Sequence, residues 1–239
     1  MRRAGRDPRR GFGYRSGDEP VTDRRRGGGR GPGRGALRRE QESRVDLSQI
    51  PVGIAPPWDV HAVIEIPQGG IPVKYELDKK SGALYVDRFL HTSMYYPGNY
   101  GFIPQTLAED GDPCDVIVVG QVPVVPGAVI RCRPIGALLM RDESGGDEKI
   151  VAVPVDKLHP FYSGVRSYRD LPPILTEQIA HFFQHYKDLE KGKWVTISKW
   201  EGPNGAAQLI RDGIARVQGI AVPPAARARG RARGQRPRR

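Results

Sequence analysis

Three aspartates lie within six residues in Asp110-Gly111-Asp112-Pro113-Cys114-Asp115, and the apolar run Val116-Ile117-Val118-Val119 follows at once. Carboxylates this close repel one another strongly in a low-dielectric cleft, so one of them is protonated or cations lie between them. The β-branched run predicts a buried strand. Hard oxygen ligands at the end of a strand suit Mg²⁺ or Mn²⁺ better than Zn²⁺. On this hexapeptide alone a solvated acidic turn is an equally good explanation. An EF-hand does not fit, because the fifth and sixth positions of that loop require an oxygen ligand and a glycine.

A second acidic turn lies downstream. It covers residues 141–149 and separates two apolar runs, 135–140 and 150–155. This pattern predicts a hairpin whose tip carries Asp142 and Asp147.

Acidic, basic and phenolic side chains precede the hexapeptide. Two short runs alternate as half-buried strands do, which places Glu65 in the first strand and Lys74 and Glu76 on one face of the second. Arg88 and the aromatic segment 95–102, which we interpret as a loop, follow. Carboxylates for several divalent cations, together with Lys, Arg and Tyr donors, indicate a site for a multiply charged phosphate anion bound with its metals.

The order of these motifs resembles that of the soluble family I inorganic pyrophosphatases of bacterial type. The resemblance covers about residues 58–200, with a weaker helical tail to about residue 220. The aspartate hexapeptide is the family's signature, and the aromatic segment and the His-Phe-Phe segment are nearly as diagnostic. The matching segments are Ile64-Glu65-Ile66-Pro67, Lys74-Tyr75-Glu76, Ser81-Gly82-Ala83-Leu84, Val86-Asp87-Arg88, Tyr96-Pro97-Gly98-Asn99-Tyr100-Gly101, the aspartate hexapeptide, the turn from Asp142 to Lys149, and the segment from His181 to Glu190.

The resemblance implies Mg²⁺-dependent hydrolysis of inorganic pyrophosphate to two orthophosphates. Two or more Mg²⁺ ions per site, with Mn²⁺ or Zn²⁺ as substitutes, would activate a water molecule and hold the phosphoryl oxygens. It also implies that Asp112 accepts the proton of the attacking water. The implied metal ligands are Asp110, Asp115 (bridging), Asp147 and Asp142. The implied phosphate-binding residues are Lys74, Arg88, Tyr100, Tyr186 and Lys187, with Glu65, Glu76 and Tyr96 lining the same cavity in supporting roles.

Taken singly, most of these residues have a simpler explanation. Lys74 and Glu76 would form a same-face ion pair, and Arg88 would cover the rim of a barrel. Tyr186 and Lys187 would end an exposed helix, and Tyr96 and Tyr100 would be ordinary core aromatics with satisfied hydroxyls. Their joint occurrence in the family's order favours the catalytic interpretation.

His181 and His185 lie four residues apart on one predicted helix, a spacing that is compatible with zinc binding. No Glu follows His181 and no third soft ligand is evident in the sequence. In bacterial members of the family this helix packs at a subunit interface. The resemblance therefore implies a homo-oligomer, a hexamer, with both histidines in or near an interface.

The apolar patterning predicts an α+β fold built on a small closed β-barrel, with two late helices. The resemblance implies that this barrel is five-stranded (OB-like) and flanked by two main helices, with the site at its mouth. A helix over about 172–188 begins with prolines, which are tolerated in a first turn, and a second helix is expected over about 205–218. Strands are expected at about 60–66, 72–77, 84–89, 115–121, 128–139, 149–155 and 194–200.

Charge divides the 239-residue chain into three parts. Residues 1–45 carry 14 Arg against 6 acids, and residues 223–239 carry 7 Arg and no acid, so the net charge of +11 leaves −4 on residues 46–222. We therefore expect one hydrolase domain over 46–222 between disordered basic tails. The Arg/Gly-rich tails also support a rival hypothesis, a nucleic-acid-binding protein with a vestigial hydrolase core. We favour a hydrolase whose tails bind polyanions or nucleic acid weakly.

Compartment and redox state follow from the remaining composition. No segment reaches the length of a membrane-spanning helix and no apolar signal-peptide core is present, so we expect a cytoplasmic protein without a membrane partner. Cys114 and Cys132 lie in apolar strand contexts, which favours reduced, buried thiols. An Arg-rich transit peptide and a hydrolase of longer polyphosphates or nucleotides remain alternatives.

Overall fold

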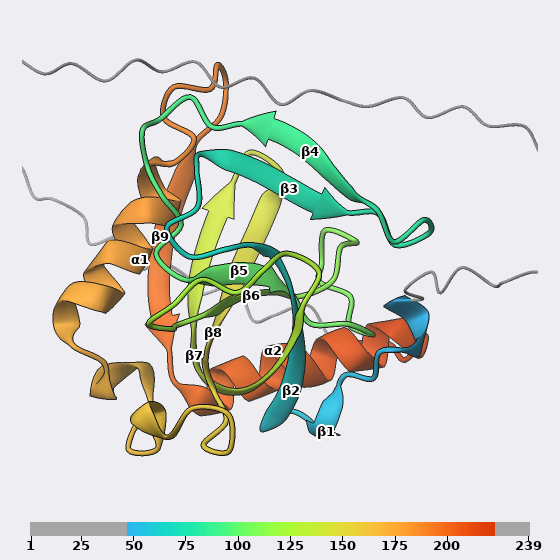
Figure 1. The fold of residues 1–239 in the computed structure, drawn as a ribbon. Coiled ribbons are helices and arrows are strands. Elements are labelled where there is room, and N and C mark those ends of the chain that lie inside the picture. Colours follow the sequence, from blue (N-terminus) through green and yellow to red (C-terminus); the bar gives the residue numbers. More distant parts are fainter. Residues whose placement is uncertain (1–46, 223–239) are drawn as a thin grey trace, which may run out of the picture. The chain divides into compact units, whose positions relative to one another are not determined.

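A computed structural model describes residues 47–222, in which the elements follow the predicted order (Figure 1). The strands are β1 (Gly53–Ala55), β2 (Asp59–Ile66), β3 (Val73–Leu77), β4 (Leu84–Phe89), β5 (Asn99–Phe102), β6 (Asp115–Val118), β7 (Val129–Asp142), β8 (Gly145–Pro154) and β9 (Val195–Glu201). The helices are α1 (Pro173–His185) and α2 (Pro203–Val217), with short 3₁₀ turns η1 (Leu47–Gln49), η2 (Pro160–Tyr162) and η3 (Tyr168–Asp170). The predicted tails, 1–45 and 223–239, lie outside the described residues.

Five strands close into the predicted barrel. The hydrogen-bonded order is β2-β5-β6-β8-β7, and β7 pairs again with β2, which completes the ring. β6 and β8 run parallel, whereas the other four pairings are antiparallel. Closure gives the backbone groups of these strands partners on both sides, so the ring has no open edge. β1 and β9 extend the sheet from β2 and β7.

The period-two side-chain pattern of the strands explains how both faces of the sheet are buried. In β6, Ile117 belongs to the apolar cluster that contains the buried side chains of α1, whereas Val116 and Val118 belong to the cluster that contains those of α2. Alternate residues of a strand point to opposite faces, so one apolar run serves two cores. β6 therefore reads as continuously apolar rather than alternating.

The two helices use prolines as starts and bury one face each. Pro173 and Pro203 occupy first-turn positions, where the missing N–H has no intrahelical partner to lose. α1 buries Ile179, Phe182 and Phe183, and α2 buries Ala206, Ala207, Ile210 and Gly213. Within residues 47–222, neither helix is long and apolar enough to cross a membrane.

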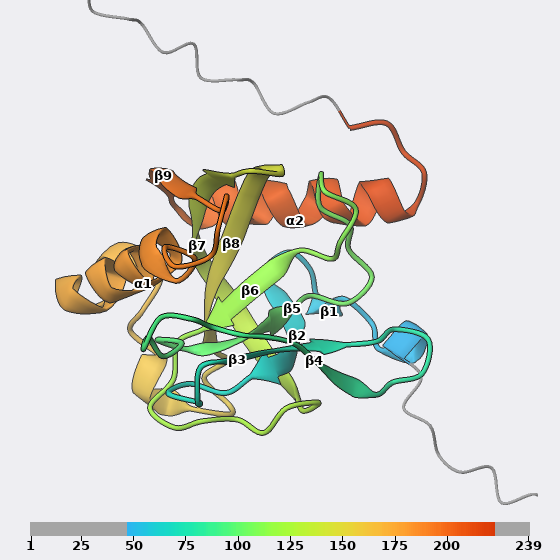
Figure 2. The same cartoon turned by 90° about the horizontal axis from the view of Figure 1, so that it is seen from above.

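The hairpin of β3 and β4 is a two-stranded sheet separate from the barrel. It lies on the opposite side of the ring from α2 in both views (Figures 1 and 2). Lys74 and Arg88 are paired across it, so one small element delivers two cationic side chains. The same-face placement of Lys74 and Glu76 is confirmed by their ion pair of 2.5 Å.

Several boundaries differ from the sequence prediction. β7 extends to Asp142 and β8 begins at Gly145, so Asp147 lies in a strand and not at the hairpin tip where we expected it. The segment that we interpreted as an aromatic loop contains β5, which pairs with β2 and β6. Its Gly101 and its prolyl neighbours mask the strand pattern, and only the two flanking strands supply its hydrogen bonds. β6 also ends at Val118, earlier than expected. Cys114 and Cys132 are buried free thiols, as predicted.

Candidate active site

A cavity of about 850 Å³ opens where β6 and β8 begin and β7 ends. Every site residue predicted from the sequence except Tyr96 lines it. Nine carboxylates line the cavity, namely Glu65, Glu76, Asp78, Asp110, Asp112, Asp115, Asp142, Glu143 and Asp147. Seven cationic side chains face them, namely Lys74, Lys79, Lys80, Arg88, Lys149, Lys187 and Lys193.

The loop between β5 and β6 carries two of the aspartates on an exposed turn. Gly111 has a φ of 94°, a conformation that side-chain-bearing residues rarely adopt. The N–H of Asp112 donates to Oδ1 of Asp110 at 3.0 Å, and the N–H of Ala108 donates to the carbonyl of Asp112 at 2.6 Å. Asp115 is the first residue of β6, where it is paired with Phe102. The predicted position of these carboxylates at the end of a strand is confirmed.

Lys149 lies between two aspartates and was not identified from the sequence. Its Nζ forms ion pairs with Asp115 and Asp147, and the residue is only 3% exposed. Burial alone would lower the pKa of Lys149, but the two carboxylates outweigh it and raise the pKa well above its usual value. Lys149 is therefore a fixed positive charge. The strand period carried a signal, since Asp147 and Lys149 share one face of β8.

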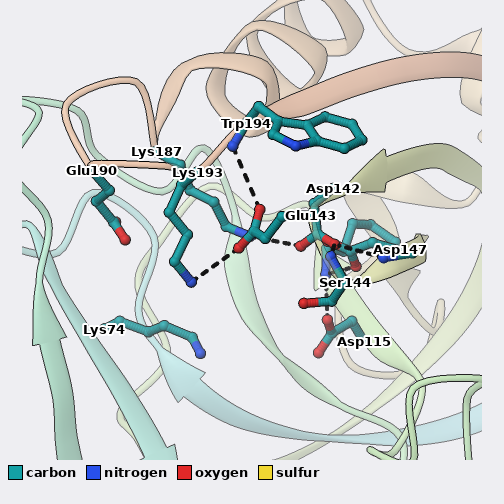
Figure 3. A network of polar contacts seen from close by, with 12 residues as sticks. Lys74, Asp115, Asp142, Glu143, Ser144, Asp147, Lys187, Glu190, Lys193 and Trp194 are labelled. Carbon is teal, nitrogen blue, oxygen red and sulfur yellow. Dashed lines mark hydrogen bonds and ion pairs between the residues drawn. The ribbon is translucent and has the colours of Figure 1, made fainter.

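A second cluster joins the hairpin tip of β7 and β8 to the segment after α1 (Figure 3). Lys187 donates to Oδ2 of Asp142 at 2.7 Å, and Lys193 lies 3.0 Å from Oε1 of Glu143. The N–H of Ser144 donates to Oδ1 of Asp142 at 2.8 Å. Burial opposes ionisation of Asp142, but Lys187 and the N–H of Ser144 outweigh it and hold the pKa of Asp142 below its usual value. Glu143 and Lys193 were not among the predicted site residues.

The β3–β4 hairpin presents its cations already paired with carboxylates. Lys74 lies 3.2 Å from Asp87, in addition to its contact with Glu76. Nη1 of Arg88 donates to Oε2 of Glu190 at 3.1 Å, which links the hairpin to the segment after α1. Among the described residues, the buried Nε of Arg88 makes no hydrogen bond, but it lies 3.6 Å from Oδ2 of Asp87. The guanidinium of Arg88 is thus held between Asp87 and Glu190 at the wall of the cavity.

Two tyrosines line the cavity as hydroxyl donors. Burial raises the pKa of Tyr100 well above its usual value and also raises that of Tyr186. Both phenols therefore stay protonated at neutral pH and can donate to an acceptor. Tyr96 is placed differently: it lies behind Tyr100, with ring centroids 5.2 Å apart, and lines a second, smaller pocket. The expectation that Tyr96 lines the same cavity does not match this placement.

Glu65 is the buried carboxylate at the base of the cavity. It is 8% exposed, and it accepts a hydrogen bond of 2.8 Å from the N–H of Leu77. Burial raises its pKa to about 7, and the charge of Asp115 contributes in the same direction against that hydrogen bond. Glu65 therefore titrates near neutrality in the metal-free protein.

The donor set fits hard divalent cations. Within residues 47–222, no three His, Cys, Asp or Glu side chains converge closely enough to enclose a metal ion, because lysine ammonium groups contact Asp115, Asp142 and Asp147. The exposed loop adds Asp110 and Asp112, which line the same cavity. Among residues 47–222, the ion pair that these two carboxylates form is a 3.5 Å contact of Asp112 with Lys79. All these groups are carboxylates, whose oxygen atoms suit Mg²⁺ or Mn²⁺.

Comparison with known proteins decides the family. Residues 62–218 match the family described as inorganic pyrophosphatase. The chain belongs to the inorganic pyrophosphatase family. It is therefore an enzyme that hydrolyses inorganic pyrophosphate, and the rival hypothesis of a nucleic-acid-binding protein with a vestigial core receives no support from these matches.

Individual relatives cover the same region. The inorganic pyrophosphatase of Caulobacter vibrioides is 72% identical over 172 residues, which are 72% of this chain and 97% of that one. That of Aquifex pyrophilus is 58% identical over 170 residues, 71% of this chain and 96% of the relative. The crystal structure of inorganic pyrophosphatase from Thermus thermophilus is 44% identical with a TM-score of 0.69, covering 73% of this chain and 99% of that one.

Replacing Glu65 by Gln should change how the stability of this pyrophosphatase depends on pH. Between pH 4.5 and about 7 the native state keeps the proton of Glu65 and the unfolded state loses it, so the stability of the metal-free wild type falls as pH rises. Glu65→Gln removes this contribution, so the variant should gain up to about 3 kcal/mol relative to wild type across the window.

Urea unfolding of EDTA-treated protein at pH 5 and pH 7.5 measures the effect. Asp212→Asn, on α2 and outside both cavities, provides the matched loss of one charge. If the free energy of unfolding differed between Glu65→Gln and wild type by the same amount at both pH values, the raised pKa of Glu65 would be contradicted.

Proposed function

We propose that the pyrophosphatase uses Mg²⁺ held by Asp110, Asp115, Asp142 and Asp147, and that Asp112 is the general base. The observation that supports this most is the convergence of these five aspartates on one cavity with cationic walls. They come from β6 and the loop before it, and from the β7–β8 hairpin. When bound, Mg²⁺ lowers the pKa of water and neutralises phosphoryl charge. Asp112 accepts the proton as the water oxygen bonds to phosphorus, and the bridging P–O bond breaks to release the second phosphate.

The cationic and phenolic side chains bind the substrate in this proposal. Lys74, Arg88 and Lys187 pair with phosphate oxygens, and Tyr100 and Tyr186 donate their hydroxyl protons. The position of these three cations at the cavity wall and the protonated state of both phenols support these roles. Glu65 and Glu76 hold the cavity walls, and Tyr96 supports Tyr100 from behind.

Metal removal is the first test. Treatment with EDTA should abolish hydrolysis of pyrophosphate, and Mg²⁺ should restore it. Ca²⁺ should inhibit the Mg²⁺ enzyme, because its larger and looser coordination shell holds the reacting groups in a different geometry. Phosphate release, measured in metal-depleted buffer with defined additions, gives the answer. Full activity without a divalent cation would refute the metal assignment. Triphosphate and ATP in the same assay test the alternative substrates.

The roles of the two aspartate positions can be separated by matched variants. Asp112→Asn should lower kcat by about two orders of magnitude with little change in KM, as loss of a general base does. Asp115→Asn should instead raise the Mg²⁺ concentration needed for half-maximal rate. Steady-state kinetics across a Mg²⁺ series measures both. Identical behaviour of the two variants at every Mg²⁺ concentration would remove the distinction between base and ligand.

We infer that the protein is a homohexamer with His181 and His185 in or near an interface. Their rings lie 4.6 Å apart, and His181 lines the second pocket beside Tyr95 and Ile174, which are 57% and 58% exposed. Large apolar side chains at such a position are typical of a contact surface.

Light scattering at neutral pH should give six times 26.4 kDa, about 158 kDa. A monomer at neutral pH would refute the hexamer.

We assign catalysis to residues 46–222 and no catalytic role to the tails. The match to the family covers 62–218, and the residues that line the cavity lie between Glu65 and Lys193. Weak binding of polyanions by the Arg-rich tails and a cytoplasmic location remain predictions from the sequence.

A further inference from the structure

We propose that Gly213 and Arg216, near the C-terminal end of α2, are positioning residues for the loop that carries Asp110 and Asp112. Neither residue lines the cavity. The proposal rests on the assignment of these aspartates as metal ligand and base. It concerns where the loop lies and not the chemistry of the aspartates. The positioning role and the proposed function can therefore be refuted separately.

The loop needs an external support because its own contacts are few. Residues 110 and 112 are exposed, and the contact of Asp112 with Lys79, at 3.5 Å, joins side chains that are 77% and 51% exposed. An ion pair this open contributes little to holding a geometry. The remaining contacts of the turn, such as Gly111 N–H to Ala108 carbonyl at 3.4 Å, are internal to the loop. They shape the turn without fixing where it lies.

α2 supplies that support through the backbone of Leu107. The N–H of Leu107 donates to the carbonyl of Gly213 at 3.0 Å, and its carbonyl accepts from Nη1 of Arg216 at 3.2 Å. Both polar backbone groups of one loop residue are thus held by one turn of helix. Nη2 of Arg216 also lies 3.5 Å from Oε1 of Glu109, the residue before the first aspartate. Figure 2 shows the loop between β5 and β6 beside α2.

Close packing at Gly213 holds both ends of the loop. A Cβ at this position would lie 2.6 Å from Sγ of Cys114 and 3.1 Å from Cβ of Thr106. Oγ1 of Thr106 accepts from the N–H of Cys114 at 3.0 Å and donates to the carbonyl of Ile103 at 2.6 Å, which ties the two ends together. The absence of a side chain at Gly213 is therefore what lets the helix reach the base of the loop.

The helix is itself a rigid reference. Ala206 and Ile210 are fully buried in a cluster with Ile103 and Val116, which lie on either side of the loop in sequence. Asp115 starts the strand that contains Val116. α2 therefore sets the position of the loop relative to Asp115 and so the spacing among the three aspartates of the hexapeptide. A small displacement of reacting groups lowers turnover strongly.

The test compares two arginines of the same helix in the full-length protein. Arg216→Gln removes the loop contact, and Arg216→Lys retains a cation. Arg211→Gln is the matched control, because Arg211 contacts Gln208 and the Trp58 ring instead. Hydrogen exchange of the segment 106–113 in metal-free protein reports loop placement independently of activity. Steady-state kinetics with Mg²⁺ and pyrophosphate reports its consequence.

We expect Arg216→Gln to speed exchange in 106–113 while β6 and β8 stay protected, and to lower kcat about tenfold with KM within about twofold. Arg216→Lys should recover part of both effects, and Arg211→Gln should match wild type.

Gly213→Ala tests the packing contact separately. Alanine favours helix more than glycine does, so a helix-only effect would stabilise the protein. We expect instead that Gly213→Ala speeds exchange of the loop and lowers kcat. Cys114→Ala removes the sulfur atom that the new methyl group would meet. Gly213→Ala should therefore have a smaller effect in a Cys114→Ala background than in the wild type. Unchanged exchange and kcat in both Arg216→Gln and Gly213→Ala, or loss of protection throughout the barrel, would overturn the proposal. If the wild type were inactive while Arg216→Gln still changed exchange of the loop, the proposed function would be refuted and the positioning role would stand.

Discussion

Repulsion among carboxylates at one end of the barrel is the constraint on which the rest of the structure depends. Nine carboxylates line one cavity, and two of the lysines that face them, Lys149 and Lys187, are buried residues. A buried ammonium is tolerated only when it is paired and hydrogen-bonded. Asp115 and Asp147 pair with the first lysine, and Asp142 with the second. The buried lysines and the aspartates that pair with them therefore stabilise each other, and neither kind of side chain would be stable as a charged group in this site without the other.

The closed ring makes this concentration of charge possible. Pairing of β2 with β7 satisfies the backbone of the barrel without open edges, so the ends of β6, β7 and β8 can meet around polar side chains. The β3–β4 hairpin and the segment after α1 then complete the walls from outside the ring. Glu190 joins these two additions through Arg88, across 102 positions of sequence. Lys149 and Lys187 are buried in this scaffold, whereas Asp110 and Asp112 lie on an exposed turn.

The placement of the tyrosines follows the same logic. Tyr100 contacts both the cavity and Phe183 of α1, with ring centroids 5.9 Å apart, so the apolar core sets the position of a polar hydroxyl. Burial keeps the phenols of Tyr100 and Tyr186 neutral beside several charges. They contribute donors without adding to the charge balance. The packing of the apolar core therefore sets the positions of the hydroxyl groups in the site.

Local pattern predicted most of the fold, whereas most of the individual site residues came from the resemblance to a known family. Alternation of apolar and polar residues predicted β2 and β3, continuous apolar runs predicted β6, β7 and β8, and apolar residues at helical spacing predicted α1 and α2. The spacing of Asp110, Asp112 and Asp115, together with the basic and phenolic residues around them in the chain, indicated a metal-dependent phosphate site. Tertiary structure alone decided what depends on register between distant segments. The strand β5 exists because β2 and β6 flank it. Lys149 meets Asp115 because β6 and β8 run parallel with Val116 opposite Ile150, and Tyr96 lies behind Tyr100 because α1 packs there. Short-range periodicity shows which face a side chain occupies, but only the closed sheet determines which other side chain it meets.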